Sequence, residues 1–281
     1  MSVNTVNAYL HDVDMLFSFF KKEKSNLSLK NVELNDLKDF ISYINNFEIG
    51  AYSQARIISG IKAFFNYLEI EKEITKNPAE LLESPRLGRK LPDILSVEEI
   101  ENIIEQIDLS SPEGERNRAM LELLYGSGLR VSELINIKIS EINFNENILL
   151  ITGKGNKQRL VPMGELSKKQ ILIYLEQIRP HIKIKKGFED ILFLNRRGSS
   201  LSRQMVFIVI KNQVEKLGIR KTISPHTFRH SFATHLVQGG ADLRVVQQLL
   251  GHVSITTTEI YTHLNTDDLR KSILEFHPRN R

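Results

Sequence analysis

Six residues between positions 130 and 261 are of the types that can hold a phosphodiester and attack it. In chain order they are Arg130 (GSGLRVSEL), Lys154 (TGKGNK), His226 and Arg229 (HTFRH), His252 (LLGHVS) and Tyr261 (TTTEIYTH). Two guanidinium groups can bind the non-bridging oxygens of one phosphate and neutralise the charge that builds up in a pentacoordinate state. A tyrosine hydroxyl can attack the phosphorus. The set predicts covalent chemistry at a phosphodiester, by a scheme that requires no metal ion.

Each member of the set has a task that its chemistry suits. The pKa of a free tyrosine is about 10, so forming the phenolate at pH 7 costs roughly 4 kcal/mol, which nearby Arg and His groups can reduce. His226 and Arg229 lie three residues apart at the predicted start of a helix, where the polarised N-terminus favours an anion. Lys154, in a predicted hairpin, can protonate a leaving sugar oxygen. Glu133, one turn after Arg130, can hold that arginine in orientation.

Taken singly, these residue types are more often surface or structural groups than catalytic ones. His252 gains significance because it follows the predicted end of a helix at Gly251, from where it can donate to an oxygen. The other histidines of this region, His230, His235 and His263, are assigned structural roles. The ordered combination, rather than any one member, indicates a catalytic site.

The elements that must position these residues begin with a helical segment. Apolar residues recur at helical spacing in three stretches of residues 1–84. The stretches are Val6, Tyr9, Leu10, Val13, Leu16, Phe17 and Phe20, then Leu34, Leu37, Phe40, Ile41 and Ile44, then Ile57, Ile58, Ile61, Phe64, Phe65 and Leu68. We expect these side chains to form the core of an all-helical domain.

The second part of the chain mixes helices with a hairpin. A helix should begin after Ser96, and β-rich runs at 147–152 and 158–162 flank the turn GKGNK. Helices are then predicted from Ser224 to the Gly239-Gly240 pair, from Asp242 to Gly251, and over 266–276. The fold class is therefore mainly α, with a small β-sheet in the second domain.

The stretch SPRLGRKLPD combines prolines, a glycine and basic residues, which is typical of an exposed connector. We place the linker at 85–93, between a domain at 1–84 and one at 94–281. If the protein clamps a duplex, the cations of this connector and of the hairpin should meet its phosphates. These candidates are Arg86, Arg89, Lys90 and Lys157.

The charge of the chain is unevenly distributed. Residues 1–84 hold 9 Lys and Arg against 12 Asp and Glu, whereas the other residues hold 29 against 22, within totals of 38 and 34. Any nucleic acid should therefore be bound chiefly by the second part. The chain has no cysteine, which excludes disulfides and thiolate metal sites, and it shows neither a signal peptide nor a long apolar run. We expect a cytoplasmic protein with no membrane association.

Four segments of the chain resemble the tyrosine recombinase (phage integrase) family, and within it the bacterial Xer recombinases. They are LLYGSGLRVSEL, ITGKGNKQRLVPMG, SPHTFRHSFATHLVQGGADLRVVQQLLGH and TTTEIYTH. The resemblance implies a helical, SAM-like core-binding domain followed by an α-rich catalytic domain. Members of this type usually carry one more helix before the motif SVNTVNAYLHD, which begins here at residue 2. We expect the grip on DNA and contacts between N-terminal domains to depend on that difference.

The resemblance also implies a site-specific recombinase. Tyr261 would form a 3′-phosphotyrosyl link, with Arg130 and Arg229 as the arginine pair and Lys154 as general acid. His226 would be the base or proton relay and His252 the second phosphate ligand. Strand exchange would pass through a Holliday junction, with neither metal, ATP nor another cofactor.

The partners implied by the resemblance are a specific duplex DNA site and other recombinase subunits. Helix 266–276 would dock on a neighbour in a homo- or hetero-tetramer, or else pack on its own core. A second recombinase or a DNA translocase would be a further partner if the biological role is chromosome dimer resolution. Integration or transposition of a mobile element is the alternative role.

Three other classes of protein share some of these features. A type IB topoisomerase uses similar chemistry, and a non-catalytic DNA-binding protein would need neither Tyr261 nor both arginines. A metal hydrolase could use His226 and His230, but the intervening Glu and a third ligand are missing. Covalent trapping, a junction substrate and chelator resistance distinguish these classes from a recombinase.

Overall fold

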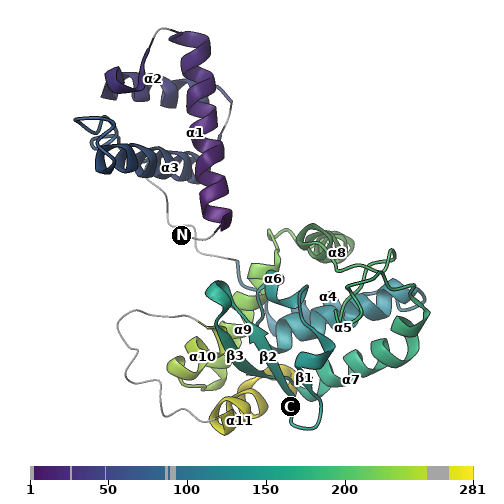
Figure 1. The fold of residues 1–281 in the computed structure, drawn as a ribbon. Helices are drawn as coiled ribbons and strands as arrows, with labels where there is room; N and C mark the ends of the chain where they lie inside the picture. Colours follow the sequence, from purple (N-terminus) through teal and green to yellow (C-terminus); the bar gives the residue numbers. More distant parts are fainter. Residues whose placement is uncertain are drawn as a thin grey trace. The chain divides into compact units, whose positions relative to one another are not determined.

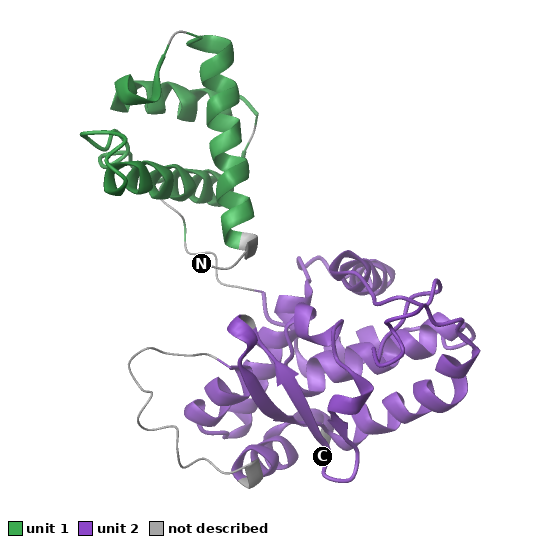
Figure 2. Ribbon diagram, in the orientation of Figure 1, with its two compact units in different colours: residues 1–91 green, residues 92–281 purple. Residues whose placement is uncertain are grey.

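Helices form where apolar residues recur at helical spacing in the sequence, and these helices belong to two compact units. The computed structural model describes residues 3–25, 27–47, 49–85, 88, 93–251 and 266–280. Residues 1–91 form one compact unit and residues 92–281 form the other (Figure 2). None of the described helices is long and apolar enough to cross a lipid bilayer.

The first unit is built from helices around an aromatic and aliphatic core. Its elements are α1 (Val3–Glu23), the 3₁₀ turn η1 (Leu29–Asn31), α2 (Leu34–Asn45) and α3 (Ala51–Ile70). The core includes Leu16, Phe20, Leu37, Phe40, Ile44, Ile57, Ile61 and Phe65. The helical prediction for this part of the chain is confirmed.

The expected core of α1 is wrong for three of its residues. Val6, Leu10 and Phe17 are 41%, 56% and 37% exposed, whereas Val13 and Leu16 are buried. The three exposed residues lie on the same face of the helix as the buried Val13, so burial changes along this stripe. Helical periodicity identifies an apolar stripe, but it does not say how much of that stripe the neighbouring helices cover.

The second unit packs helices beside and behind a three-stranded antiparallel sheet, in the view of Figure 1. Its elements before the sheet are α4 (Val97–Glu105), α5 (Pro112–Gly126), α6 (Val131–Leu134) and η2 (Ile139–Glu141). The sheet and hairpin comprise β1 (Ile142–Asn143), β2 (Ile148–Thr152), η3 (Lys154–Asn156) and β3 (Gln158–Pro162). After them come α7 (Glu165–Ile173), the π-helical turn η4 (Tyr174–Ile178), η5 (Arg179–His181), α8 (Arg203–Lys216), α9 (Pro225–Gly239), α10 (Leu243–Leu250), α11 (Thr266–Phe276) and η7 (Pro278–Asn280).

The sheet turns one apolar face toward the core. Leu149 pairs with Val161 across β2 and β3, and both side chains are buried with Ile151. The two long strands match the predicted runs to within a residue, while the two-residue strand β1 was not foreseen. The hairpin between β2 and β3 therefore projects from a fixed base.

The ends of α9 and α10 follow from local capping chemistry. Ser224 and Pro225 start α9, and Gly240 ends it with a φ of 109°. The Asp242 carboxylate accepts from the backbone N–H of Arg244 at the start of α10, and Gly251 ends that helix with a φ of 63°. Both helices occupy the predicted positions.

The last helix packs on its own unit. Leu269 and Ile273 of α11 are 4% and 1% exposed, within the same core as α9 and α10. Phe276 lies against the Gly239-Gly240 pair, where a Cβ on Gly239 would come within 2.6 Å of the Phe276 carbonyl oxygen. In the single chain, α11 thus packs on the core of its own unit, which is the second of the two arrangements expected for it.

The residues after α11 close the unit over a buried acid. Arg279 forms an ion pair with Glu122 of α5, whose side chain is 1% exposed, and a second one with Glu101. Burial raises the pKa of Glu122, although Arg279 acts in the opposite direction. His277 is fully buried, and its ring contacts those of Tyr125 and Phe232.

Replacing Arg279 with alanine would leave Glu122 buried without its partner. We expect Arg279→Ala to lower the free energy of unfolding by about 3 kcal/mol. The unpaired acid would favour its protonated form, so the loss should be larger at pH 8 than at pH 5. Urea unfolding at both pH values measures it. Arg196→Ala, which removes an exposed ion pair with Glu113, is the matched control and should cost less than about 1 kcal/mol.

Candidate active site

The site begins at a turn that only glycine fits. Between α5 and α6 the chain reverses at Gly128, whose φ is 57°. A Cβ there would lie 2.3 Å from the Phe232 ring of α9, so the turn packs directly against that helix. Arg130 follows as the N-cap residue of α6, and its backbone N–H donates to Glu133 Oε2 at 2.7 Å. The start of α6 is therefore fixed by contact with α9.

Glu133 is the centre of the site. Its carboxylate accepts from Arg130 Nη1 at 2.8 Å and from Arg159 Nη1 and Nη2 at 2.7 and 2.9 Å. Arg229 Nη1 lies 3.9 Å from Oε2. Burial raises the pKa of Glu133, but the hydrogen bonds from Arg159 and from the Arg130 backbone outweigh it and bring the pKa to about 2. The acid is ionised at any physiological pH.

Arg229 links three parts of the chain. From α9 its guanidinium donates to the carbonyl of Gly128 at 2.7 Å and to the carbonyl of Leu250 at the end of α10. Burial, with the charge of Arg130, lowers the pKa of Arg229 to about 10, while Glu133 acts in the opposite direction. The group is still a cation at neutral pH, and it ties the turn before Arg130 to the segment that leads to His252.

Three guanidinium groups thus surround one carboxylate, which leaves a local excess of positive charge. The side chain of Arg130 is 32% exposed, against 14% for Arg159 and 9% for Arg229. Arg130 Nη2 also approaches the Gly251 carbonyl at 3.4 Å. Within the described residues, the site presents Arg130 to solvent and keeps the other two cations behind it. Such an arrangement suits an anionic oxygen.

The hairpin places two predicted cations at its tip. Lys154 begins η3, and Lys157 follows it with an exposed side chain. The loop is closed by the Gly153 N–H, which donates to the Lys157 carbonyl at 2.8 Å, and it needs a positive φ at Gly155 and Asn156. The position of the Lys154 side chain lies outside what the structure describes.

The three histidines of α9 differ in how far they are exposed to solvent. His226 lies one turn before Arg229 with an exposed side chain, and His230 is half-buried. His235 is buried, and its Nδ1 lies 2.7 Å from the Tyr125 hydroxyl, which agrees with a structural role. The α9 helix therefore carries one accessible imidazole near the arginine cluster.

Several predicted residues lie outside the described parts of the chain. They are His252, Tyr261, His263, Arg86, Arg89 and Lys90. His252 directly follows Gly251, whose carbonyl lies near Arg130. Among the described members, the structure brings together Arg130, Glu133 and Arg229.

Arg159 is a member of the cluster that was not predicted from the sequence. It lies on β3 two residues before the buried Val161, so the period of a strand places both side chains on the same face. An arginine on a buried face requires an acidic partner, which here is Glu133. That alternation was the available signal.

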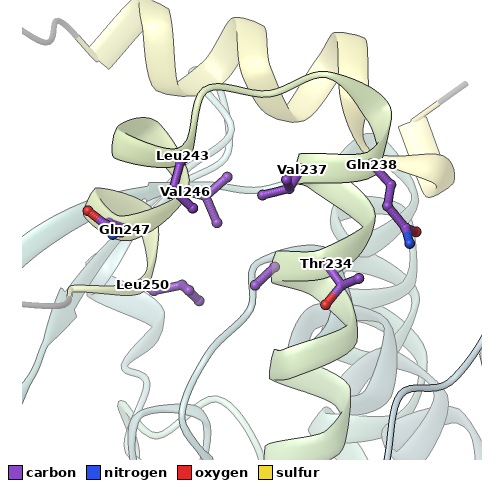
Figure 3. Close-up of a pocket in the computed structure, with 8 residues that line it drawn as sticks. Thr234, Val237, Gln238, Leu243, Val246, Gln247 and Leu250 are labelled. Atoms are coloured by element: carbon purple, nitrogen blue, oxygen red, sulfur yellow. The ribbon is translucent and has the colours of Figure 1, made fainter.

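Figure 3 shows a separate hollow, an apolar groove between α9 and α10. Val237, Leu243, Val246 and Leu250 point into it, and none of the residues that line it is charged. Leu250 belongs to both places, because its carbonyl binds Arg229. The described residues of its lining include no cation to bind a phosphate, so the groove is not the candidate active site.

Comparison with known families agrees with this geometry. The phage integrase family matches residues 93–268, and the N-terminal SAM-like domain of phage integrases matches residues 1–72. The chain belongs to the phage integrase family, whose members are tyrosine recombinases that cut and rejoin DNA. The predicted family, fold class and enzyme class are confirmed.

The relatives are Xer recombinases. Tyrosine recombinase XerD of Staphylococcus saprophyticus is 41% identical over 279 residues, which cover 99% of this chain and 94% of XerD. Tyrosine recombinase XerD of Staphylococcus aureus is 40% identical with the same coverage. The protein is therefore a Xer-like tyrosine recombinase.

Solved structures include recombinases on DNA. XerH site-specific recombinase bound to its difH substrate is 27% identical, with a TM-score of 0.71 over 95% of this chain and 78% of XerH. The Tn1549 transposon integrase with circular intermediate DNA has a TM-score of 0.74 over 97% of this chain and 94% of that one, at 21% identity. The second match supports the fold alone.

The turn at Gly128 gives a test of how the site is held. Gly128→Ala combines a left-handed backbone with a clash against Phe232, whereas Gly187→Ala has a φ of 90° and open space around its Cβ. We expect Gly128→Ala to cost about 2 kcal/mol more in unfolding free energy than this control. It should also slow DNA cleavage, because Arg130 follows the turn. Equal losses in the two variants, measured by urea unfolding, would contradict the packing argument.

Proposed function

We propose that this Xer-like recombinase cuts and rejoins duplex DNA at a specific site through a 3′-phosphotyrosyl intermediate on Tyr261. The observation that carries the proposal is the cluster of Arg130, Arg159 and Arg229 around Glu133, which leaves a net positive charge with Arg130 exposed. Gly153 and Gly251, which directly precede Lys154 and His252 in the chain, both lie close to Arg159. Its charge matches that of a phosphodiester whose negative charge increases during substitution.

The proposed cleavage step transfers a phosphoryl group from the 5′ oxygen of the DNA to the Tyr261 oxygen. The Tyr261 oxygen attacks phosphorus, its proton passes to His226, and the bond from phosphorus to the 5′ oxygen breaks. Lys154 protonates the leaving oxygen, while Arg130, Arg229 and His252 bind the phosphate. The phosphotyrosine retains the energy of the broken bond, so rejoining by another 5′-hydroxyl needs neither ATP nor a metal ion.

The biological setting of the proposal follows from the resemblance to Xer recombinases. We propose strand exchange through a Holliday junction in a tetramer, with α11 moving from its own unit to a neighbour. The role would be chromosome dimer resolution in the cytoplasm, with a second recombinase or a DNA translocase as a further partner. The connector 85–93 would join the core-binding domain to the catalytic domain around the duplex.

Covalent trapping tests the proposed nucleophile. Wild-type protein incubated in EDTA with nicked duplexes that carry candidate sites should form a protein–DNA adduct visible on denaturing gels. Tyr261→Phe should bind the same DNA and form no adduct, because phenylalanine has no attacking oxygen. An adduct with Tyr261→Phe would assign the nucleophile elsewhere. Wild-type protein that binds the DNA without forming an adduct would contradict the cleavage proposal.

The exposed Lys157 tests the contact between the hairpin and DNA. Lys157→Gln should weaken binding to all duplex sequences and reduce the slope of log affinity against log salt by about one. Lys186→Gln removes the same charge from an exposed position outside the hairpin. Fluorescence anisotropy over a series of salt concentrations compares the two variants. If their slopes are equal, Lys157 makes no specific phosphate contact.

A further inference from the structure

Arg159 forms hydrogen bonds with two separate parts of the site. Its Nη1 and Nη2 hold both oxygens of Glu133, at 2.7 and 2.9 Å, and its Nε donates to the Leu249 carbonyl at 3.0 Å. A bidentate pair fixes the orientation of both groups as well as their distance. One side chain on β3 therefore holds α6 and the last turn of α10 at the same time.

Two glycines that directly precede predicted catalytic residues lie against the Arg159 side chain. A Cβ on Gly251 would lie 3.1 Å from Arg159 Cδ and 3.2 Å from Nε. A Cβ on Gly153 would lie 3.4 Å from Nη1. Gly251 is followed by His252 and Gly153 by Lys154, so the chain passes close to the Arg159 side chain immediately before each of these residues.

Charge gives Arg159 a second effect on the site. A buried carboxylate facing Arg130 alone would neutralise the cation that the site presents to solvent. With Arg159 bound to both of its oxygens, Glu133 has a partner of its own and can still orient Arg130 through the 2.8 Å hydrogen bond. Arg130 keeps positive charge available for a phosphate.

We propose that Arg159 is a positioning residue for DNA cleavage, which acts by holding Glu133 and the end of α10 so that Arg130 and the segment entering His252 face one phosphate. The inference rests on the proposed cleavage function. Arg159 donates to protein groups from Nε, Nη1 and Nη2, so its effect on the reaction is indirect.

Three variants separate position from charge. Arg159→Gln removes the cation, Arg159→Lys keeps it but cannot form the bidentate pair, and Arg197→Gln removes one positive charge from an exposed position. We expect Arg159→Gln to slow adduct formation on the nicked duplex by on the order of 10- to 100-fold, the usual effect of removing a group that orients a site. Arg159→Lys should fall between it and wild type. DNA affinity of Arg159→Gln should equal that of Arg197→Gln, and DNA affinity of Arg159→Lys should equal that of the wild type.

The pH dependence gives a readout that general loss of structure would not reproduce. Arg159 helps to hold the pKa of Glu133 at about 2, so the wild-type acid stays ionised from pH 5 to pH 8. Without Arg159 this pKa rises, and Glu133 becomes protonated and weakens its hold on Arg130 as the pH falls. The rate deficit of Arg159→Gln should therefore grow from pH 8 to pH 5.

A titration of the Glu133 carboxyl by ¹³C NMR makes the test independent of catalysis. A raised Glu133 pKa in Arg159→Gln, together with slower cleavage and a DNA affinity equal to that of Arg197→Gln, supports the proposal. An unchanged pKa overturns it, and so does a raised pKa with cleavage at the wild-type rate. Failure of the wild type to form any adduct would instead reject the cleavage function, and the titration would still decide whether Arg159 controls Glu133.

Discussion

The catalytic unit depends on one buried carboxylate. Burying the Glu133 carboxylate alone would cost free energy. Three arginines compensate its charge: Arg130 at the start of α6, Arg159 on β3 and Arg229 on α9. These elements are distant in sequence, so none can shift without exposing or unpairing a charge. A single acid thus aligns the helix that carries Arg130, the hairpin that carries Lys154 and the helix that carries His226.

Backbone carbonyls extend this alignment to α10. The carbonyls of Leu249, Leu250 and Gly251 accept from Arg159, Arg229 and Arg130 in turn. These acceptors are the unpaired groups that every helix leaves at its C-terminus. In this fold arginine side chains take the place of water there, so the last turn of α10 belongs to the charged cluster. A helix end, usually a place where a chain frays, becomes a rigid part of the site.

The features that could be predicted from the sequence are those set by local chemistry. Ser224 with Pro225, Asp242 and the glycines at 240 and 251 define α9 and α10, because capping depends on neighbouring residues alone. The partners of Arg159 and Arg279 lie 26 and 157 residues away, and no local pattern encodes such pairs. Similarly, the period of α1 located the helix but not the exposure of Leu10, which depends on how far other helices extend. The residue types of the site were recognisable, whereas the group that organises them was not.

The closing of the unit by Arg279 sets an order of events during protein synthesis. Glu122 lies in α5, beside the helix and turn that deliver Arg130, and its ionic partner is made 157 residues later. A nascent chain that has passed Tyr261 but not Arg279 holds every predicted catalytic residue while Glu122 still lacks that partner. Because domains tend to fold as the chain emerges from the ribosome, the second unit can complete this ion pair only after translation has reached Arg279. The position of one arginine thereby ties the stability of this unit to residues that are made after Tyr261.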